Sequence, residues 1–538
     1  MELGSGTRTG TGKPRLRKSW WWTAALAVSA TCATALTPAT AVEHDAPAES
    51  TTRAQGAPVG HSNVSPPRIR WYDACPKGWK MPQGWKCGAM TTPLDHARPG
   101  KGTVELAVAK LPARKPERRV GSLLTNPGGP GGSGIADAAN GNWQRYFTGK
   151  MRERFDLVAY DPRGVAHSRP ALNCAQQDDA DDYPPHPRTA REMLAELRKK
   201  DKSGAGCAKK AGRLVPHMST VDNVRDLERL RQAVKDRKLN FLGVSYGTTI
   251  GAVYANLYPH RVRSMILHGI VDARTQMNNT AAFSITQAQG YAHALRARLH
   301  ACDKTSKQRC AFTGNAEAKF NRLAAHLGNT HRPRPASRKQ WDELLYYASA
   351  FIGNEDELGT RAAAQKLQHL YESTFGSRRP NSRAAQAAQV PTNEEDVLAA
   401  TNCLDTPPLP KRHRHWLTWF RQARAQAPLF GPGEVIEKKY CRDWPSKFRA
   451  AAPRHTGPWN RARVPILLIN QRWDQSTPLR WARNMRQAMG QRGLVIIHGH
   501  WHGVPTNCSR AKSEAYLLHR TAPTGEEVCP DGDSKPFG

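Results

Sequence analysis

The segment Gly243-Val244-Ser245-Tyr246-Gly247 constrains the fold more than any other part of the sequence. It follows an apolar run at 239–244 that predicts a buried strand, and it precedes a helical pattern at 248–258. A chain that passes so abruptly from strand to helix needs glycines where side chains would collide, and it exposes the serine at a helix N-terminus. An ordinary turn is the alternative, but the strand before and the helix after favour Ser245 as a nucleophile.

Strand and helix patterns alternate on both sides of this segment. Such alternation predicts an α/β core with a mostly parallel sheet and helices on both faces. We expect this core in two parts, residues 68–274 and 455–538. Their other predicted elements are strands at 104–111, 120–125, 155–160, 263–267, 464–470 and 493–498, and helices at 220–237 and 479–489.

Residues 275–454, between the two parts of the core, differ in composition. Ala, Gln, Arg and Leu dominate, β-branched runs are scarce, and helical stretches such as 360–371 are separated by proline-rich loops. This segment is therefore predicted to be a helical cap inserted into the core.

The N-terminus has the pattern of an export signal. A basic stretch precedes the apolar residues 20–36, and Ala39-Thr40-Ala41 offers a cleavage site, which assigns residues 1–41 to a signal peptide. A membrane anchor is the alternative, but polar residues interrupt the apolar run, which is marginal for the ~20 residues of a span. Residues 42–67 are rich in Ala, Pro, Ser and Thr and predict a flexible linker. We expect a secreted, extracellular protein without a membrane span after cleavage.

Export determines how the cysteines are interpreted. Of the 11 cysteines, Cys32 falls in the leader, so an even number remains, which favours disulfides in an oxidising compartment. Sequence alone does not fix the connectivity, but the cysteines form neighbouring couples. These couples are Cys75 with Cys87, Cys174 with Cys207, Cys302 with Cys310, Cys403 with Cys441, and Cys508 with Cys529.

The formal net charge of +35 favours polyanionic surfaces such as nucleic acid or an anionic cell envelope. The basic residues are spread along the whole chain, and their densest runs lack interleaved aromatic residues and any nucleic-acid-binding motif. Nucleic acid is therefore not an expected partner. The charge is interpreted as a solvated surface that tolerates an anionic cell envelope, which is a candidate partner. A non-catalytic, basic, envelope-binding protein on the same scaffold is an alternative function.

The glycine-rich segment 126–134 follows the predicted strand at 120–125. It lacks the Lys-Ser or Lys-Thr pair of a phosphate-binding loop and the spacing of a dinucleotide site, so no cofactor is expected. In a hydrolase, such glycines let a backbone N–H approach the oxyanion of a tetrahedral intermediate. We predict that the amides of Gly129 and Tyr246 form this oxyanion hole.

The acid and the base of a catalytic triad are predicted near the C-terminus. Asp474 follows the strand at 464–470, and His502 follows the next helix and strand. The chain order Ser245, Asp474, His502 is that of the α/β-hydrolase fold. The pattern His498-Gly499-His500-Trp501-His502 also allows a metal site, but no carboxylate or cysteine cluster accompanies it, so no metal is expected.

These residues resemble the secreted tripeptidyl aminopeptidase family of actinobacteria, α/β-hydrolases related to prolyl aminopeptidases. The resemblance covers most of the chain after the leader and implies the triad Ser245, Asp474 and His502. It also implies release of di- or tripeptides from the free N-terminus of peptide substrates. The most specific stretches are NPGGPGGSG at 126–134, FDLVAYDPRGVAHS at 155–168, GVSYGT at 243–248, YANLYP at 254–259, NCLD at 402–405 and CRDWP at 441–445.

The sequence departs from the family pattern at three places. Trp501 stands where the family has a glycine before the base, which keeps His500 as a second candidate. His268 replaces an aspartate after the strand at 263–267. Ala166-His167-Ser168 replaces a Gly-Arg or Gly-Ser pair at the end of the DPRG segment.

An aminopeptidase must bind a free α-amino group, and a carboxylate does so by charge-assisted hydrogen bonding. Asp405, Glu355, Asp356 and Glu357 are candidates for this role, and solvated helix charges or caps are the alternative interpretation. A carboxylesterase or lipase-like enzyme is the rival function, because the same triad serves esters equally well.

Overall fold

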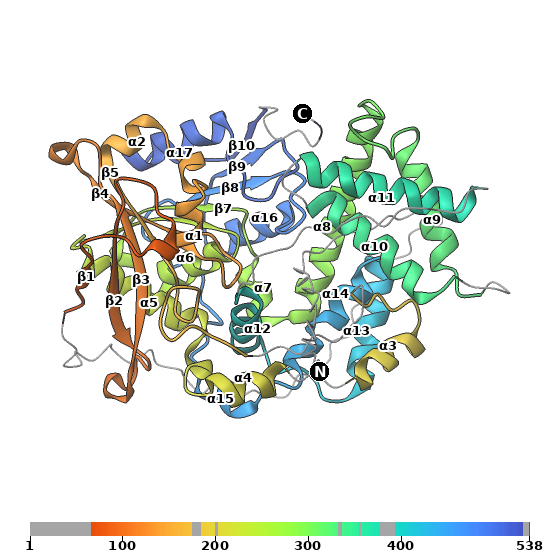
Figure 1. Cartoon of the computed structure of the whole chain (residues 1–538), viewed down its shortest axis with the longest axis horizontal. Coiled ribbons are helices and arrows are strands. Elements are labelled where there is room, and N and C mark those ends of the chain that lie inside the picture. The colour runs from red at the N-terminus through yellow and green to blue at the C-terminus, as the bar shows by residue number, and fades with distance from the viewer. Residues whose placement is uncertain are drawn as a thin grey trace, which may run out of the picture.

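The computed structural model describes residues 66–174, 184–199, 203–331, 336–353, 357–376, 393–530 and Phe537. The predicted signal peptide and nearly all of the predicted linker lie outside these residues. A twisted sheet with flanking helices lies beside a large helical layer, which is coloured green to cyan in Figure 1. Among the described residues, no helix is long and apolar enough to cross a bilayer.

The sheet has ten strands in the order β1-β2-β3-β5-β4-β6-β7-β8-β9-β10. The pairs from β1 to β3 and the pair β3–β5 are antiparallel, and all pairs from β5 through β4 to β10 are parallel. The strands are β1 Ile69–Trp71, β2 Lys86–Pro93, β3 Thr103–Leu111, β4 Gly121–Asn126, β5 Phe155–Tyr160, β6 Leu239–Val244, β7 Val262–His268, β8 Leu467–Gln471, β9 Leu494–Ile497 and β10 Glu526–Cys529.

The central strands are short runs of apolar residues, and every residue of β4, β5, β6 and β8 is buried. Such runs suit parallel strands that helices cover on both faces. Buried side chains of α5 (Thr220–Ala233), α6 (Tyr246–Leu257) and α16 (Leu479–Ala488) belong to one core cluster. The buried side chains of three other helices belong to a second core cluster, which contains strand residues of the other face of the sheet. These helices are α1 Gly134–Ala139, α2 Gly149–Arg154 and α17 Asn507–His519.

Every regular element in the described part of the chain between β7 and β8 is a helix. Helices α8 to α11 enclose a hydrophobic cluster of their own, with Leu295, Phe320, Leu345 and Leu367. Helix α12 instead contributes to the core that covers the sheet. The helices are α7 Ala273–Asn278, α8 Thr280–Asp303, α9 Ala316–Gly328, α10 Arg338–Gly353, α11 Glu357–Phe375, α12 Glu394–Asp405, α13 His413–Gln426, α14 Gly431–Glu437 and α15 Ser446–Ala451.

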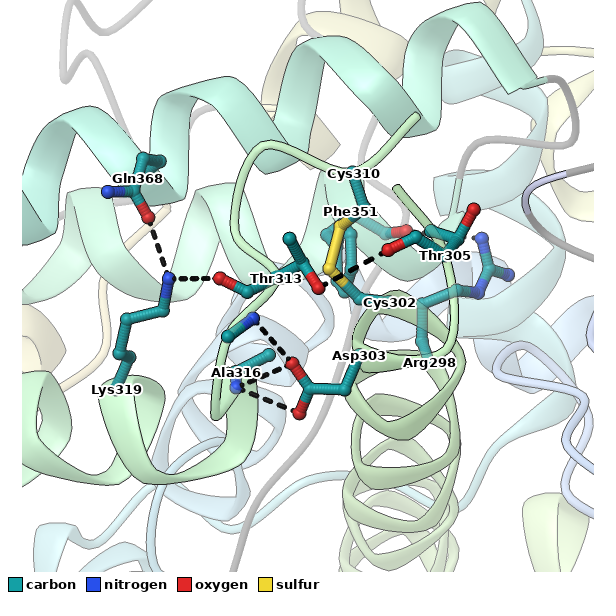
Figure 2. Close-up of a disulfide and its surroundings, with 11 residues drawn as sticks. Arg298, Cys302, Asp303, Thr305, Cys310, Thr313, Ala316, Lys319, Phe351 and Gln368 are labelled. Atoms are coloured by element: carbon teal, nitrogen blue, oxygen red, sulfur yellow. Dashed lines mark hydrogen bonds between the residues drawn. A yellow bond between two sulfur atoms is a disulfide. The ribbon is translucent and has the colours of Figure 1, made fainter. Parts of the chain in front are cut away.

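Five disulfides join the neighbouring couples of cysteines. The Cys302–Cys310 bridge closes the turn that follows α8, as Figure 2 shows. In the same turn, the Asp303 carboxylate accepts hydrogen bonds from the Ala316 amide at the start of α9. Lys319 then links that turn to Gln368 of α11. The bridge and these hydrogen bonds together fix the corner between α8, α9 and α11.

The structure differs from the predicted elements mainly at their ends. The helix predicted at 220–237 ends at Ala233, because Lys235 takes the left-handed conformation with φ 62°. The helix predicted from residue 248 begins two residues earlier, at Tyr246. Strands β1, β2 and β10 lie outside the predicted set, because β1 has only three residues and the mixed polar and apolar residues of β2 and β10 give no continuous apolar run.

Candidate active site

Ser245 lies at the sharp turn between β6 and α6. Its backbone is strained, with φ 55° and ψ −126°, a region that non-glycine residues rarely occupy. A side-chain carbon on Gly243 would come within 2.3 Å of the Gly247 carbonyl oxygen, so the turn requires glycine there. The amide of Ser245 donates to the His268 carbonyl at 3.0 Å. The strain and these close contacts match the geometry of a nucleophile elbow.

Asp474 and His502 form a buried pair at the same edge of the sheet. Nδ1 of His502 lies 2.9 Å from Oδ2 and 3.0 Å from Oδ1 of Asp474. Thr477 orients the carboxylate through its amide, at 2.7 Å, and its hydroxyl, at 2.9 Å. An imidazole that donates from Nδ1 to a carboxylate keeps Nε2 able to accept a proton, as a general base requires.

Two glycines bring His502 close to the end of β6. A side-chain carbon on Gly269 would lie 2.9 Å from Cε1 of His502. One on Gly503 would lie 2.7 Å from Val244, the residue before Ser245. The structure therefore gathers Ser245, Asp474 and His502, which follow the carboxyl ends of β6, β8 and β9, at one edge of the sheet. Their catalytic roles stay a prediction.

The glycine-rich loop after β4 lies directly against Ser245. A side-chain carbon on Gly128, which has φ 107°, would be 2.7 Å from Cβ of Ser245 and 3.0 Å from the Tyr246 nitrogen. The Gly128 amide already donates to Asn126 at 3.1 Å. Among the described residues, no hydrogen bond is found for the Gly129 amide, so this donor is available for an oxyanion. The assignment of Gly129 and Tyr246 as oxyanion donors stays a prediction.

Asp405 lies behind the turn, where it supports Tyr246. The Thr220 amide donates to Asp405 Oδ1 at 3.0 Å, and the Thr220 hydroxyl donates to Oδ2 at 2.6 Å. The same hydroxyl lies 2.6 Å from the Tyr246 hydroxyl. Burial raises the pKa of Asp405 to about 7, against these hydrogen bonds, which lower it. Both carboxylate oxygens are thus occupied, which does not favour Asp405 as an amine ligand.

The other predicted amine ligands are not placed at the site. Glu355 and Asp356 lie outside the described residues, and only the backbone of Glu357 is described, at the start of α11.

Glu394, which the sequence analysis did not single out, lies against the glycine-rich loop. A side-chain carbon on Gly129 would be 3.1 Å from Glu394 Oε1, and one on Gly131 would be 2.6 Å from the Glu394 carbonyl oxygen. Burial, with the nearby Asp137 as a second cause, raises the pKa of Glu394 to about 7. A carboxyl group therefore lies next to the predicted oxyanion hole.

Asn393 fixes the position of Glu394. Its side-chain amide donates to the carbonyl oxygens of Gly164 at 2.7 Å and Leu172 at 2.8 Å, and its oxygen accepts from the Ala166 amide at 3.1 Å. The first turn of α12 is thereby attached to the loop that follows β5. The altered Ala166-His167 segment is stabilised in turn by His167 Nδ1, 2.8 Å from Asp161.

Two further histidines, His500 and His268, are buried near the Asp474–His502 pair. His500 is the second candidate for the base, and His268 replaces an aspartate of the family pattern. His500 stacks on Trp473 with ring centroids 4.5 Å apart, and burial, followed by Arg298, lowers its pKa well below 6.5. His268 Nε2 lies 3.1 Å from Gln471 Oε1, and burial lowers its pKa to about 4. The carboxylate of Asp474 contacts His502, which favours His502 over His500 as the base. Within the described ranges, no group of three or more metal-ligating side chains is arranged to hold a metal ion.

A mostly parallel sheet that carries a strained serine and a buried Asp–His pair at the carboxyl ends of its parallel strands defines an α/β hydrolase. The sequence pattern of the α/β hydrolase fold family matches residues 121–501, so the chain belongs to this family and is a serine hydrolase.

Three curated relatives extend along most of the chain. It is 32% identical over 476 residues to "Serine protease Hip1" of Mycobacterium tuberculosis (strain ATCC 25618 / H37Rv), covering 84% of this chain and 88% of that protein. It is 28% identical over 499 residues to "Tripeptidyl aminopeptidase" of Streptomyces lividans, covering 88% and 89%. It is 26% identical over 477 residues to "Carboxylesterase B" of Mycobacterium tuberculosis (strain CDC 1551 / Oshkosh), covering 82% and 86%. The predicted resemblance to the tripeptidyl aminopeptidase family is thereby confirmed.

Proposed function

We propose that this chain is a secreted serine aminopeptidase that releases di- or tripeptides from the free N-terminus of peptides through an acyl-enzyme on Ser245. The observation that carries the proposal is the buried Asp474–His502 pair beside the strained Ser245. The names of two relatives that align with most of the chain, a serine protease and a tripeptidyl aminopeptidase, favour peptides as substrates.

The reaction follows from the positions of these groups. Ser245 Oγ attacks the scissile carbonyl carbon while Nε2 of His502 takes the hydroxyl proton, and the carbonyl oxygen becomes an oxyanion. The amides of Gly129 and Tyr246 stabilise that charge. The C–N bond then breaks as His502 returns the proton to the leaving amine, which leaves an acyl ester on Ser245. Water, deprotonated by His502, hydrolyses the ester and releases the N-terminal unit.

We propose Glu394 as the ligand of the substrate's α-amino group. Its carboxyl group borders Gly129, the neighbour of Gly128, which packs on Ser245. The pKa of about 7 means that the ionised carboxylate of Glu394 lacks enough positive charge and hydrogen bonds around it to replace the water lost on burial. An incoming ammonium group supplies the missing opposite charge, so a free amine is bound more tightly than an acylated one.

The helical segment 275–454 is proposed as a cap over this site, inserted between the core parts 68–274 and 455–538. Asn393 and Glu394 place the start of α12 against the glycine-rich loop, so the cap borders the site from the side of the oxyanion hole. The proposed signal peptide 1–41 and linker 42–67 would direct the chain outside the cell. The five disulfides support an oxidising destination. The strong positive charge suits an anionic cell envelope as a partner there.

The test is a panel of peptidyl anilides of one to four residues, each with a free and an acetylated N-terminus, beside short acyl esters. We expect acetylation to lower kcat/KM on the order of 10²-fold, because the Glu394–ammonium contact is lost. Glu394→Gln should produce a similar loss on free peptides and little change on acetylated ones. Glu395→Gln, which removes the same charge one residue later, is the matched control.

A carboxylesterase is the second candidate, favoured by the relative named for that activity. Faster turnover of simple acyl esters than of any peptide, together with equal rates on free and acetylated peptides, would establish it in place of the peptidase.

A further inference from the structure

The loop that carries His502 connects β9 to α17, and the core of the protein supports it on one side. The Gly503 carbonyl accepts a hydrogen bond from the Tyr146 hydroxyl. The Val504 carbonyl accepts one from Gln471 Nε2 at 2.6 Å. These contacts fix the chain directly after His502.

Arg298 of α8, in the proposed cap, contacts the same loop directly before His502. Its guanidinium carbon lies 4.4 Å from the centre of the Trp501 ring. One of its nitrogens lies 3.5 Å from the His500 carbonyl oxygen. The loop is therefore held on both sides of His502, by the core after it and by the helical segment before it.

Arg298 is an unusual residue to find in this place. It is only 1% exposed, and among the described residues no carboxylate contacts it. Burying an unpaired guanidinium is costly unless other groups replace water. Here the replacements are the Phe351 and Ile352 carbonyls, at 3.2 and 3.3 Å, at the negative end of the α10 dipole, and the face of an aromatic ring. Burial lowers the pKa of Arg298 to about 9.

The position of Arg298 is itself fixed. Its Nη1 also lies 3.2 Å from the Thr360 hydroxyl of α11, which ties it to a third helix. Figure 2 shows Arg298 one helical turn before Cys302, whose disulfide to Cys310 closes the end of α8. A cation held by α8, α10 and α11 together moves with those helices and not independently of them.

We propose that Arg298 and Trp501 are positioning residues, which align His502 with Ser245 only while the α8–α11 part of the cap is seated against the core. The proposal rests on the proposed catalytic role of His502. Trp501 and His502 share one peptide bond, so a shift of the indole moves the imidazole with it. A displacement of about 1 Å at a catalytic group can cost about 10²-fold in rate. A glycine at residue 501, as in the family that the chain resembles, offers no ring for the cation.

The test compares Trp501→Gly and Arg298→Met with the conservative variants Trp501→Phe and Arg298→Lys. We expect kcat on the best peptidyl anilide to fall about 10- to 100-fold in the first two, with KM nearly unchanged, because the amine and acyl sites are intact. Trp501→Phe should recover most of the loss, because a phenyl ring still faces the cation. The rate at which a fluorophosphonate labels Ser245 should fall in parallel.

Two control variants separate positioning from general destabilisation. Trp459→Gly removes an indole that is 6% exposed, as that of Trp501 is, but that does not belong to the loop between β9 and α17 that carries His502. Arg296→Met removes a cation from the exposed side of the same helix, where it pairs with Glu317. Both should keep the wild-type kcat below their melting temperatures. The double variant Trp501→Gly/Arg298→Met should lose no more kcat than either single variant, because the two side chains act through one contact.

Unchanged kcat in folded Trp501→Gly, an equal loss in Trp459→Gly, or additive losses in the double variant would each overturn the proposal. Failure of the proposed peptidase function is distinguishable, because the wild-type protein would then hydrolyse esters and not peptides. In that case, the kcat of each variant relative to the wild type is measured on the ester, and the same outcomes support or overturn the positioning role of Arg298 and Trp501. Retained activity in Ser245→Ala contradicts the serine mechanism and overturns both.

Discussion

The guanidinium of Arg163 forms two hydrogen bonds with Asp226, with nitrogen–oxygen distances of 2.7 and 2.8 Å, and both side chains are fully buried. Thr92 and His96 also contact this carboxylate, each at 2.9 Å. Burial alone would raise the pKa of Asp226, but the charge of Arg163 holds this pKa well below its usual range. The pair joins the loop after β5 to helix α5. The same loop binds Asn393 at the start of α12.

Asp226→Asn should lower the free energy of unfolding by about 3–5 kcal/mol, because it leaves the buried Arg163 without its counter-charge. Urea denaturation followed by circular dichroism measures this loss. Glu105→Gln is the control: its partner Arg70 is mostly exposed, so the loss there should stay below about 1 kcal/mol. Similar losses in the two variants would contradict the interpretation.

Ser245→Ala and His502→Ala should each lower kcat by up to about 10⁶-fold, because the members of a triad act as a unit. His500→Ala should keep most of the activity, since the Asp474 carboxylate contacts His502. Steady-state hydrolysis at matched protein concentration checks all three, with a thermal melt to verify folding. An inactive His500→Ala beside an active His502→Ala would reverse the assignment of the base.

Asp405→Asn should change how stability depends on pH. The folded protein keeps the Asp405 proton up to a pKa of about 7, whereas the ordinary value for the unfolded chain is 3.8. The wild type therefore loses stability relative to the variant as pH rises through this window, by at most about 1.4 kcal/mol per pH unit. Urea midpoints of both proteins at about pH 2.5, 4, 5.5, 7 and 8.5 measure the difference, which should level off below and above the window. A difference that is constant across these pH values would show that burial does not raise the pKa of Asp405 in the folded protein.

Removal of single disulfides should reduce stability in the order of the loops that they close. Cys403 and Cys441 are 38 residues apart, whereas Cys302 and Cys310 are 8 apart. Loop entropy predicts losses of about 4 and about 2.5 kcal/mol for the paired alanine substitutions. Denaturant unfolding of the two double variants tests this order. A larger loss for Cys302→Ala/Cys310→Ala would mean that the contacts of Asp303 at the α8–α9 corner dominate over loop entropy.

The sequence predicted the core elements closely, because their signals are local. Strands β5 and β6 match the predicted ranges to the residue, since each is a short run with a single polar residue, Asp156 or Asn240, between polar turns. The end of α5 was predicted too late, because Val234 continues the helical spacing while Lys235 turns the backbone.

The side chains around the site depend on distant contacts, which no local pattern encodes. Asp405 was singled out because it follows Cys403, but its role depends on Thr220, from a different part of the chain. Glu394 begins a helix beside two other acids, which is the ordinary pattern of helix N-terminal charges. Only its contact with Gly129 and Gly131 distinguishes it.

The disulfides have a consequence for how the protein can be made. Each of the five bridges joins two cysteines that are consecutive along the chain after the predicted leader. If the chain is exported as proposed, an oxidase that acts while it emerges from a translocation channel meets both members of a couple before the next couple arrives. The native bonds then form in order of emergence, with no need for isomerisation. Refolding the complete reduced chain in a test tube loses that order and opens roughly 900 alternative pairings.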